Sequence, residues 1–196
     1  DVVAAMEQQF ALTAPAGGAT GGPTPTGVPT VMAVPPIGQV YAILRIPRLG
    51  SGWAKPVYEG VGLDVLARGL GHYPTSDQPG QVGNVAIAGH RAGHGNPLID
   101  IDAIRDGDRL IIETREGWFV YRVQRHTIVA PTDWEVVARV PERPGVKPTE
   151  RWFTLTSCEP RYGSLNRYIV FSLLETSFTR AQGLPAEYLA DPAQGI

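Results

Sequence analysis

Residues 151–161 read Arg-Trp-Phe-Thr-Leu-Thr-Ser-Cys-Glu-Pro-Arg and contain the only cysteine in this chain of 196 residues. Aromatic and β-branched residues at the start of the stretch favour a buried strand. Glu159-Pro160 ends it, because proline cannot donate a backbone hydrogen bond to a ladder. Alternation along the strand puts every second residue on one face: Trp152, Thr154, Thr156 and Cys158. The thiol is therefore expected at a strand end, where the fold is rigid and the surface is open.

A second strand is predicted to begin at Arg167 and run to Leu174. The residues between the two strands include Pro160, Gly163 and Asn166, which suit a loop that joins neighbouring strands. Antiparallel pairing of the two strands would bring Cys158 and Arg167 to the same rim of the sheet.

A third apolar strand, residues 84–88, ends in Gly89-His90-Arg91. A thiolate can act as the nucleophile and a histidine as its acid or base. A guanidinium is always charged and planar, so Arg167 could hold a developing oxyanion without taking part in proton transfer. His90, Cys158 and Arg167 thus form a candidate nucleophilic site.

Three segments, residues 88–91, 154–158 and 166–170, resemble the signature segments of sortases, the cysteine transpeptidases of Gram-positive cell surfaces. The resemblance extends over roughly residues 40–175 and keeps the segments in the family's order. The family usually has threonine where this chain has Ser157. The stretch Gly-His-Tyr-Pro at 71–74 is most similar to class E sortases of actinobacteria.

This resemblance implies a reaction and a set of site residues. The Cys158 thiolate would attack the carbonyl of a Thr-Gly bond, His90 would protonate the departing amine, and Arg167 would steady the oxyanion. Tyr73, Thr156 and Ser157 are the candidate substrate-binding residues. In class E, a tyrosine in this region is associated with a preference for Leu-Ala-x-Thr-Gly over Leu-Pro-x-Thr-Gly.

The implied partners are secreted proteins that carry a C-terminal sorting signal and a peptidoglycan amine that accepts the threonyl carbonyl. No cofactor is expected. His90 and His94 have a zinc-like spacing, but Gly93 and Gly95 favour a loop. Four carboxylates have a spacing that fits no EF-hand loop, and a solvated turn explains them better: Asp100, Asp102, Asp106 and Asp108.

The remainder of residues 39–176 reads as mainly β. Short strands, a hairpin about Glu116-Gly117 and few short helices favour a closed or nearly closed barrel. The sortase resemblance implies eight strands. Residues 53–58 are expected to be an edge strand or an extended connection, because Pro56 interrupts them. The long connection 130–151, with a helical turn at 134–137, is expected to form one wall of the peptide groove.

Residues 1–38 are predicted to be a flexible linker, since residues 11–38 are rich in proline, glycine and threonine. Residues 177–196 are predicted to be a C-terminal tail. The chain starts at Asp1 and holds no apolar run of membrane-spanning length. A membrane anchor is therefore expected upstream, with this chain a soluble fragment at the extracellular face of the plasma membrane.

A net charge of −2 without a basic cluster argues against nucleic acid as a partner. Two alternatives remain for the activity: a pilin-polymerising sortase, which differs only in its acceptor, and a non-catalytic wall-binding barrel. The second would leave the His, Cys and Arg set unexplained. An L,D-transpeptidase would show Ser-His-Gly-Cys, whereas here Thr156-Ser157-Cys158 precedes Glu-Pro.

Overall fold

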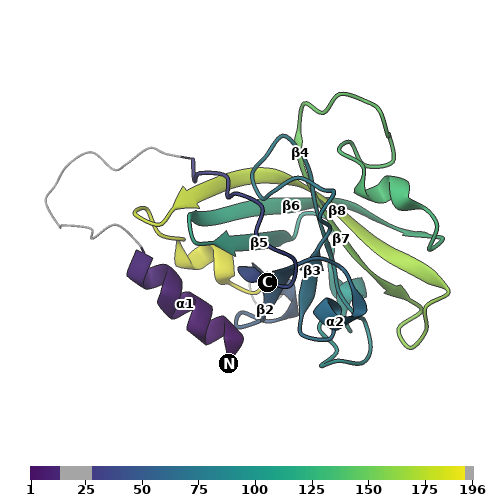
Figure 1. The fold of residues 1–196 in the computed structure, drawn as a ribbon, viewed down its shortest axis with the longest axis horizontal. Coiled ribbons are helices and arrows are strands. Elements are labelled where there is room, and N and C mark those ends of the chain that lie inside the picture. Colours follow the sequence, from purple (N-terminus) through teal and green to yellow (C-terminus); the bar gives the residue numbers. More distant parts are fainter. Residues whose placement is uncertain (14–27, 193–196) are drawn as a thin grey trace, which may run out of the picture.

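The computed structural model describes residues 1–13 and 28–192 and shows a closed β-barrel (Figure 1). Its strands are β1 (Val40–Arg45), β2 (Ala54–Glu59), β3 (Leu70–His72), β4 (Gly83–Ala88), β5 (Arg109–Thr114), β6 (Gly117–Val129), β7 (Arg151–Glu159) and β8 (Asn166–Thr179). The helices are α1 (Val2–Thr13), α2 (Leu63–Leu66) and the 3₁₀ turns η1 (Pro47–Leu49), η2 (Ile101–Ala103), η3 (Trp134–Val137) and η4 (Ala186–Leu189). The predicted mainly β, eight-stranded barrel is confirmed.

The strand order around the barrel is β1-β2-β3-β4-β7-β8-β6-β5. The pairs β2–β3 and β4–β7 are parallel, and the others are antiparallel. Inward side chains fill the interior, among them the fully buried Phe119, Tyr121 and Phe153. Closure leaves no open sheet edge along the barrel wall, so the strand ends and their loops form the functional surface.

Strand β2 corrects the prediction for residues 53–58. It is a full member of the barrel, paired with β1 on one side and β3 on the other. The pairing of β2 with β3 begins at Val57, one residue after Pro56. Proline has no N–H to donate, and at Pro56 the β3 side of the strand requires none. The predicted hairpin between β5 and β6 and the turn at η3 are present.

The predicted linker over residues 1–38 is wrong for its first part, because residues 2–13 form α1 beside the barrel (Figure 1). Met6 and Phe10, four positions apart, are buried against Ile43. Glu7 also pairs with Arg45 at 2.5 Å. Residues 28–38 have no regular structure, although Met32 packs on the core. The rest of the predicted linker, residues 14–27, lies outside the described residues.

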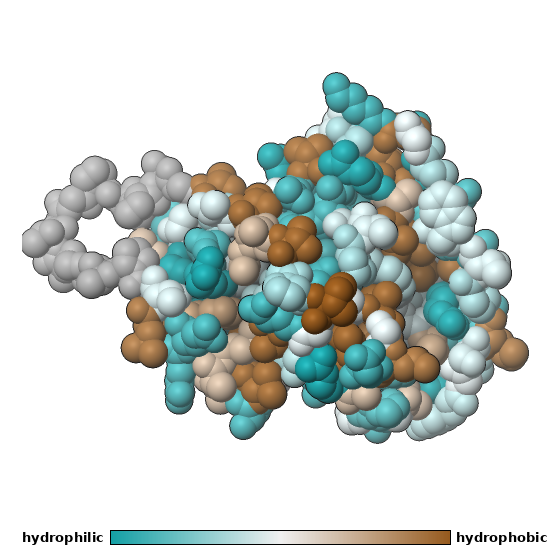
Figure 2. All heavy atoms as spheres, viewed as in Figure 1, coloured by the Kyte–Doolittle hydropathy of each residue, from teal (hydrophilic) through white to brown (hydrophobic). Residues whose placement is uncertain are grey.

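The predicted tail boundary also shifts, since β8 continues to Thr179 and η4 follows at Ala186. Seen from the side of Figure 1, hydrophobic and hydrophilic side chains are intermixed over the surface (Figure 2). Among the described residues, no helix combines the length and apolarity needed to cross a membrane.

Candidate active site

Cys158 and Arg167 lie opposite each other at the end of the β7–β8 ladder, as the sequence predicts. The ladder behind them is buried from Phe153 to Ser157, and both residues are half-buried where it reaches the surface. Arg167 uses Nη1 to donate to the carbonyls of Ser164 (3.1 Å) and Asn166 (2.9 Å). These two bonds hold the guanidinium at the rim, on the residue that pairs with Cys158.

His90 reaches the same rim from β4, which runs parallel to β7 with Ala88 opposite Thr156. The Gly89 N–H donates to the Thr156 carbonyl at 3.1 Å, and Ser157 Oγ donates to the Gly89 carbonyl at 2.9 Å. Parallel strands in register bring residues at equal distances past the pair to the same end of the sheet. His90 and Cys158, each two positions after the Ala88–Thr156 pair, therefore lie at the same end of the sheet.

Burial, and after it the neighbouring His94, lower the pKa of His90. The two rings stack with centroids 4.8 Å apart, so a proton on one disfavours a proton on the other. The Nε2 atom of His90 is buried and has no hydrogen-bond partner among the described residues. No contact among the described residues therefore fixes which nitrogen of the neutral ring carries the proton.

Arg91 contacts the backbone of the candidate site, and no role was predicted for it. Its guanidinium is 2% exposed and donates to the Cys158 carbonyl at 3.4 Å and to the Glu159 carboxylate. It also pairs with Asp102 at 3.0 Å and lies over the Tyr168 ring. The sequence contains a signal for this ion pair, because Arg91 directly follows His90 and Glu159 directly follows Cys158.

A cavity of about 140 Å³ adjoins the rim and is lined by two of the three predicted substrate-binding residues, Tyr73 and Thr156. The Tyr73 hydroxyl and Thr156 Oγ1 are hydrogen-bonded at 3.1 Å. The third, Ser157, does not line the cavity. Its hydroxyl is buried and donates a hydrogen bond to the Gly89 carbonyl instead. Arg167 lines the cavity, which links this space to the candidate reacting groups.

The opposite wall of the cavity comes from the long connection after β6. Its lining residues there are Ala130, Pro131, Asp133, Trp134, Val136 and Val137. Val136 is buried against Ile169 and Phe171 on the outside of β8, so η3 packs firmly on the barrel. The cavity is thus a groove between the η3 segment and the Tyr73 side.

The carboxylates that follow the His90 loop are engaged in ion pairs. Arg161 contacts Asp100 at 2.9 Å and Asp102 at 3.3 Å, and Arg48 contacts Asp108 at 2.7 Å. In the described ranges, no three His, Cys, Asp or Glu side chains are grouped so that they could hold a metal ion.

The sortase domain model matches residues 44–175, two-thirds of the chain, and includes β4, β7 and the part of β8 that carries Arg167. The chain belongs to the sortase family. The sortase SrtE1 of Streptomyces coelicolor is 35% identical to it over 156 residues, which are 76% of this chain and 44% of that protein. This sortase chain spans about half the length of the curated relatives it matches.

Solved sortase structures agree with the barrel. Sortase E from Streptomyces avermitilis has a TM-score of 0.71 and 40% identity, over 79% of this chain and 99% of that one. Sortase E1 from Streptomyces coelicolor, solved with a tripeptide in its active site, has a TM-score of 0.67 and 32% identity, over 76% and 95%. Together these relatives place the chain with class E sortases.

Proposed function

We propose that this sortase is a cysteine transpeptidase that cleaves a Thr-Gly bond in a C-terminal sorting signal. The observation that carries the proposal is the meeting of Cys158, Arg167 and His90 at one rim, on strands β7, β8 and β4. A non-catalytic wall-binding barrel would need no such set.

In the proposed reaction, the Cys158 thiolate attacks the threonyl carbonyl and forms a C–S bond. The carbonyl oxygen becomes an oxyanion, which the Arg167 guanidinium stabilises. As the tetrahedral intermediate collapses, the C–N bond breaks and the His90 imidazolium donates a ring proton to the leaving amine. A threonyl thioester on Cys158 remains.

An acceptor amine then attacks the thioester carbonyl. Neutral His90 takes the proton of the attacking amine, the C–S bond breaks, and Cys158 leaves as the thiolate. The new amide joins the sorted protein to the acceptor, and both catalytic groups return to their starting protonation states. We propose a peptidoglycan amine as the acceptor; a pilin lysine would serve the same chemistry.

The groove supports a preference for Leu-Ala-x-Thr-Gly over Leu-Pro-x-Thr-Gly. Tyr73 lines the groove, and its hydroxyl, which is hydrogen-bonded to the lining residue Thr156, can also accept a backbone hydrogen bond. Alanine in the signal offers an N–H at this position, whereas proline has none. Sortases are cell-surface enzymes, and we propose the extracellular face of the plasma membrane as the site of action.

Mass spectrometry of the protein mixed with a Leu-Ala-x-Thr-Gly peptide tests the proposal. The expected result is a mass increase that matches the acyl-threonyl fragment in the wild type and no increase in Cys158→Ala. Addition of a short peptidoglycan-type amine should then remove the adduct and release a ligated peptide. A folded wild type that forms no adduct with this peptide or its Leu-Pro-x-Thr-Gly counterpart would contradict the proposal.

A further inference from the structure

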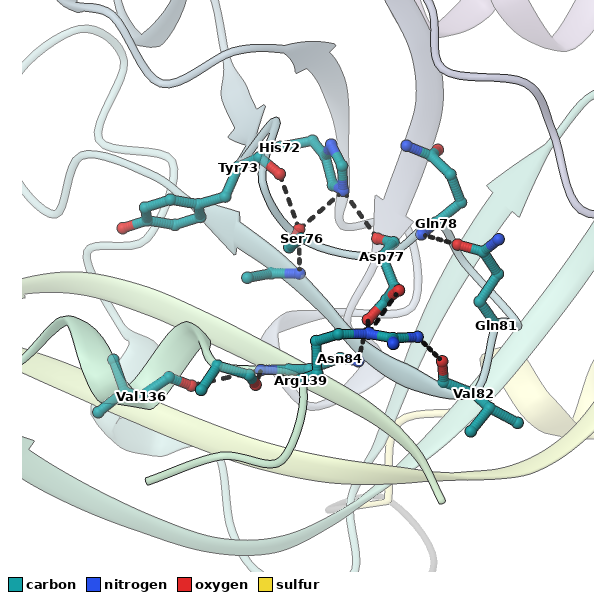
Figure 3. Close-up of polar contacts among 12 residues, drawn as sticks. His72, Tyr73, Ser76, Asp77, Gln78, Gln81, Val82, Asn84, Val136 and Arg139 are labelled. Atoms are coloured by element: carbon teal, nitrogen blue, oxygen red, sulfur yellow. Dashed lines mark hydrogen bonds and ion pairs between the residues drawn. The ribbon is translucent and has the colours of Figure 1, made fainter. Parts of the chain in front are cut away.

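A hydrogen-bond network behind the groove joins its two walls (Figure 3). Asp77 and Asn84 lie at its centre and bind each other twice. The Asp77 N–H donates to the Asn84 carbonyl at 2.9 Å, and the Asn84 N–H donates to Asp77 Oδ2 at 2.9 Å. Neither residue lines the groove.

Asn84 holds the η3 wall by its side-chain amide. It is fully buried on β4, and its Nδ2 donates to the carbonyls of Ala138 (2.9 Å) and Val136 (3.3 Å). Its Oδ1 accepts from Thr154 Oγ1 at 2.9 Å. The two carbonyls can only accept, so the amide has one orientation, in which both hydrogens and the oxygen have partners.

Arg139, directly after this attachment, provides a second one. Its Nε donates to both carboxylate oxygens of Asp77, at 3.1 and 3.2 Å, and its Nη2 donates to the Val82 carbonyl at 2.9 Å. Figure 3 shows the Arg139 guanidinium lying across the Asp77 carboxylate. The end of the η3 segment is thus fixed to the loop that precedes β4.

The same Asp77 also reaches the Tyr73 wall. His72 Nε2 lies 2.9 Å from the Asp77 carbonyl and 2.9 Å from Ser76 Oγ. Ser76 Oγ donates to the Tyr73 carbonyl at 2.8 Å. Both walls of the groove are therefore connected through one residue.

We propose that Asn84, Asp77 and Arg139 are positioning residues that hold the η3 wall in its binding-competent place before a peptide arrives. The inference rests on the proposed function, because the ordered wall increases affinity only for a sorting signal that binds in the groove. A wall that is ordered in advance spares the peptide the entropic cost of ordering it. If the competent wall is populated only in part, the apparent affinity falls by that fraction while bond cleavage is unchanged.

The test compares Arg139→Gln and Asn84→Asp with the control Arg115→Gln. Arg115 is exposed to the same degree as Arg139 (55% and 57% of the side chain) and also forms one ion pair, on the β5–β6 turn. Asn84→Asp keeps an oxygen that accepts from Thr154 Oγ1. It replaces the NH₂ group, which donates to the carbonyls of the η3 wall, with an oxygen that cannot donate. Arg139→Lys keeps the charge but loses the planar fork, so it should give intermediate values.

Two readouts are measured, one without substrate and one with it. Amide hydrogen exchange over residues 134–140 is expected to be faster in Arg139→Gln and Asn84→Asp and unchanged in Arg115→Gln. With a Leu-Ala-x-Thr-Gly peptide, KM should rise about threefold in Arg139→Gln and about tenfold in Asn84→Asp. In both variants kcat should stay within about twofold of the wild type. The position of the wall changes only the fraction of free enzyme that is able to bind the peptide.

Wild-type exchange in both variants would overturn the proposal, and so would a fall in kcat with KM unchanged. Arg139→Gln alters a half-exposed side chain, so it decides the question even if Asn84→Asp does not fold. If the wild type itself cleaves neither peptide, the proposed substrate is wrong, and the exchange experiment still decides whether the three residues hold the wall.

Discussion

At the scale of single residues, the site combines a reactive rim with a charged support beneath it. Arg91 is buried, and its guanidinium meets carboxylates from both sides, Glu159 on β7 and Asp102 after the His90 loop. A buried ion pair contributes little net stability when intact, but removal of one partner leaves an uncompensated charge. Arg91 therefore fixes the backbone on which His90 and Cys158 stand.

Arg91→Gln is expected to lower the free energy of unfolding by about 3 kcal/mol, because it leaves the Glu159 carboxylate without its cation. Urea unfolding measures the change. Arg161→Gln removes an exposed cation that shares only Asp102 with Arg91, so it should have a much smaller effect. The double variant Arg91→Gln with Glu159→Gln should recover part of the loss, and strictly additive losses would contradict the pairing.

Removal of His94 should raise the pKa of His90. Burial and the adjacent ring lower that pKa, so His90 carries its proton only at lower pH than a free histidine does. His94→Asn removes the second cause, which increases the imidazolium form at pH 7 and with it the supply of the proposed acid. An NMR titration of the His90 ring should show a higher midpoint, with faster peptide cleavage at pH 7. An unchanged or lower midpoint would contradict the coupling.

Tyr73→Phe should change the choice of substrate more than the chemistry. The hydroxyl is the group that can accept a backbone N–H from alanine in the signal, and a neutral hydrogen bond of this kind is worth about 1 kcal/mol. The value of kcat/KM for Leu-Ala-x-Thr-Gly is expected to fall about fivefold, with little change for Leu-Pro-x-Thr-Gly. Equal losses for both peptides would indicate that Tyr73 only packs under the loop.

At the scale of elements, α1 acts as an extra layer on the barrel. Met6 and Phe10 are buried on Ile43, and the guanidinium of Arg180 lies 4.8 Å from the centre of the Phe10 ring. The helix is therefore held by packing at two places, the start of the barrel in β1 and the residue that follows β8.

Phe10→Ala should destabilise the protein by about 3 kcal/mol, the usual cost of removing a buried phenylalanine ring. The matched control is Leu12→Ala, because Leu12 lies on the same helix and is 87% exposed. Thermal unfolding measures both. Equal midpoints for the two variants would show that α1 contributes no packing energy to the folded state.

At the scale of the whole molecule, closure makes the barrel a single cooperative unit. Every strand has two neighbours, and the parallel β4–β7 pair connects residues 83–88 with residues 151–156. Loss of any strand would expose two rows of backbone groups and open the core. The site, which stands on three strands, should be lost only when the barrel opens.

Urea unfolding followed by far-ultraviolet circular dichroism and by tryptophan fluorescence should give superimposable transitions. The first signal reports the strands, and the second reports tryptophans that include Trp152 beside η3 and Trp53 beside the barrel core. A fluorescence change that precedes the loss of strand signal would contradict cooperativity and would mean that η3 detaches first.

Local patterns and family motifs were enough to predict the barrel class and the three candidate reacting residues. Alternation in residues 151–158 and the short loop before Arg167 are local patterns, and they predict the strand, its face and the rim where it ends. The signature segments then supplied the family. A similar local pattern predicts that His90 lies at a strand end, because Gly89-His90 directly follows the apolar stretch 84–88.

The contacts between distant segments could be found only from the folded chain. Arg91 and Glu159 are 68 positions apart, and Asn84 meets η3 more than 50 positions away. The docking of α1 and the place of β2 in the barrel wall also depend on partners that the local sequence does not contain. Local periodicity sorts the residues of a strand onto two faces, but the free energy of an ion pair or of the Asn84 hydrogen bonds depends on what the folded chain places opposite them.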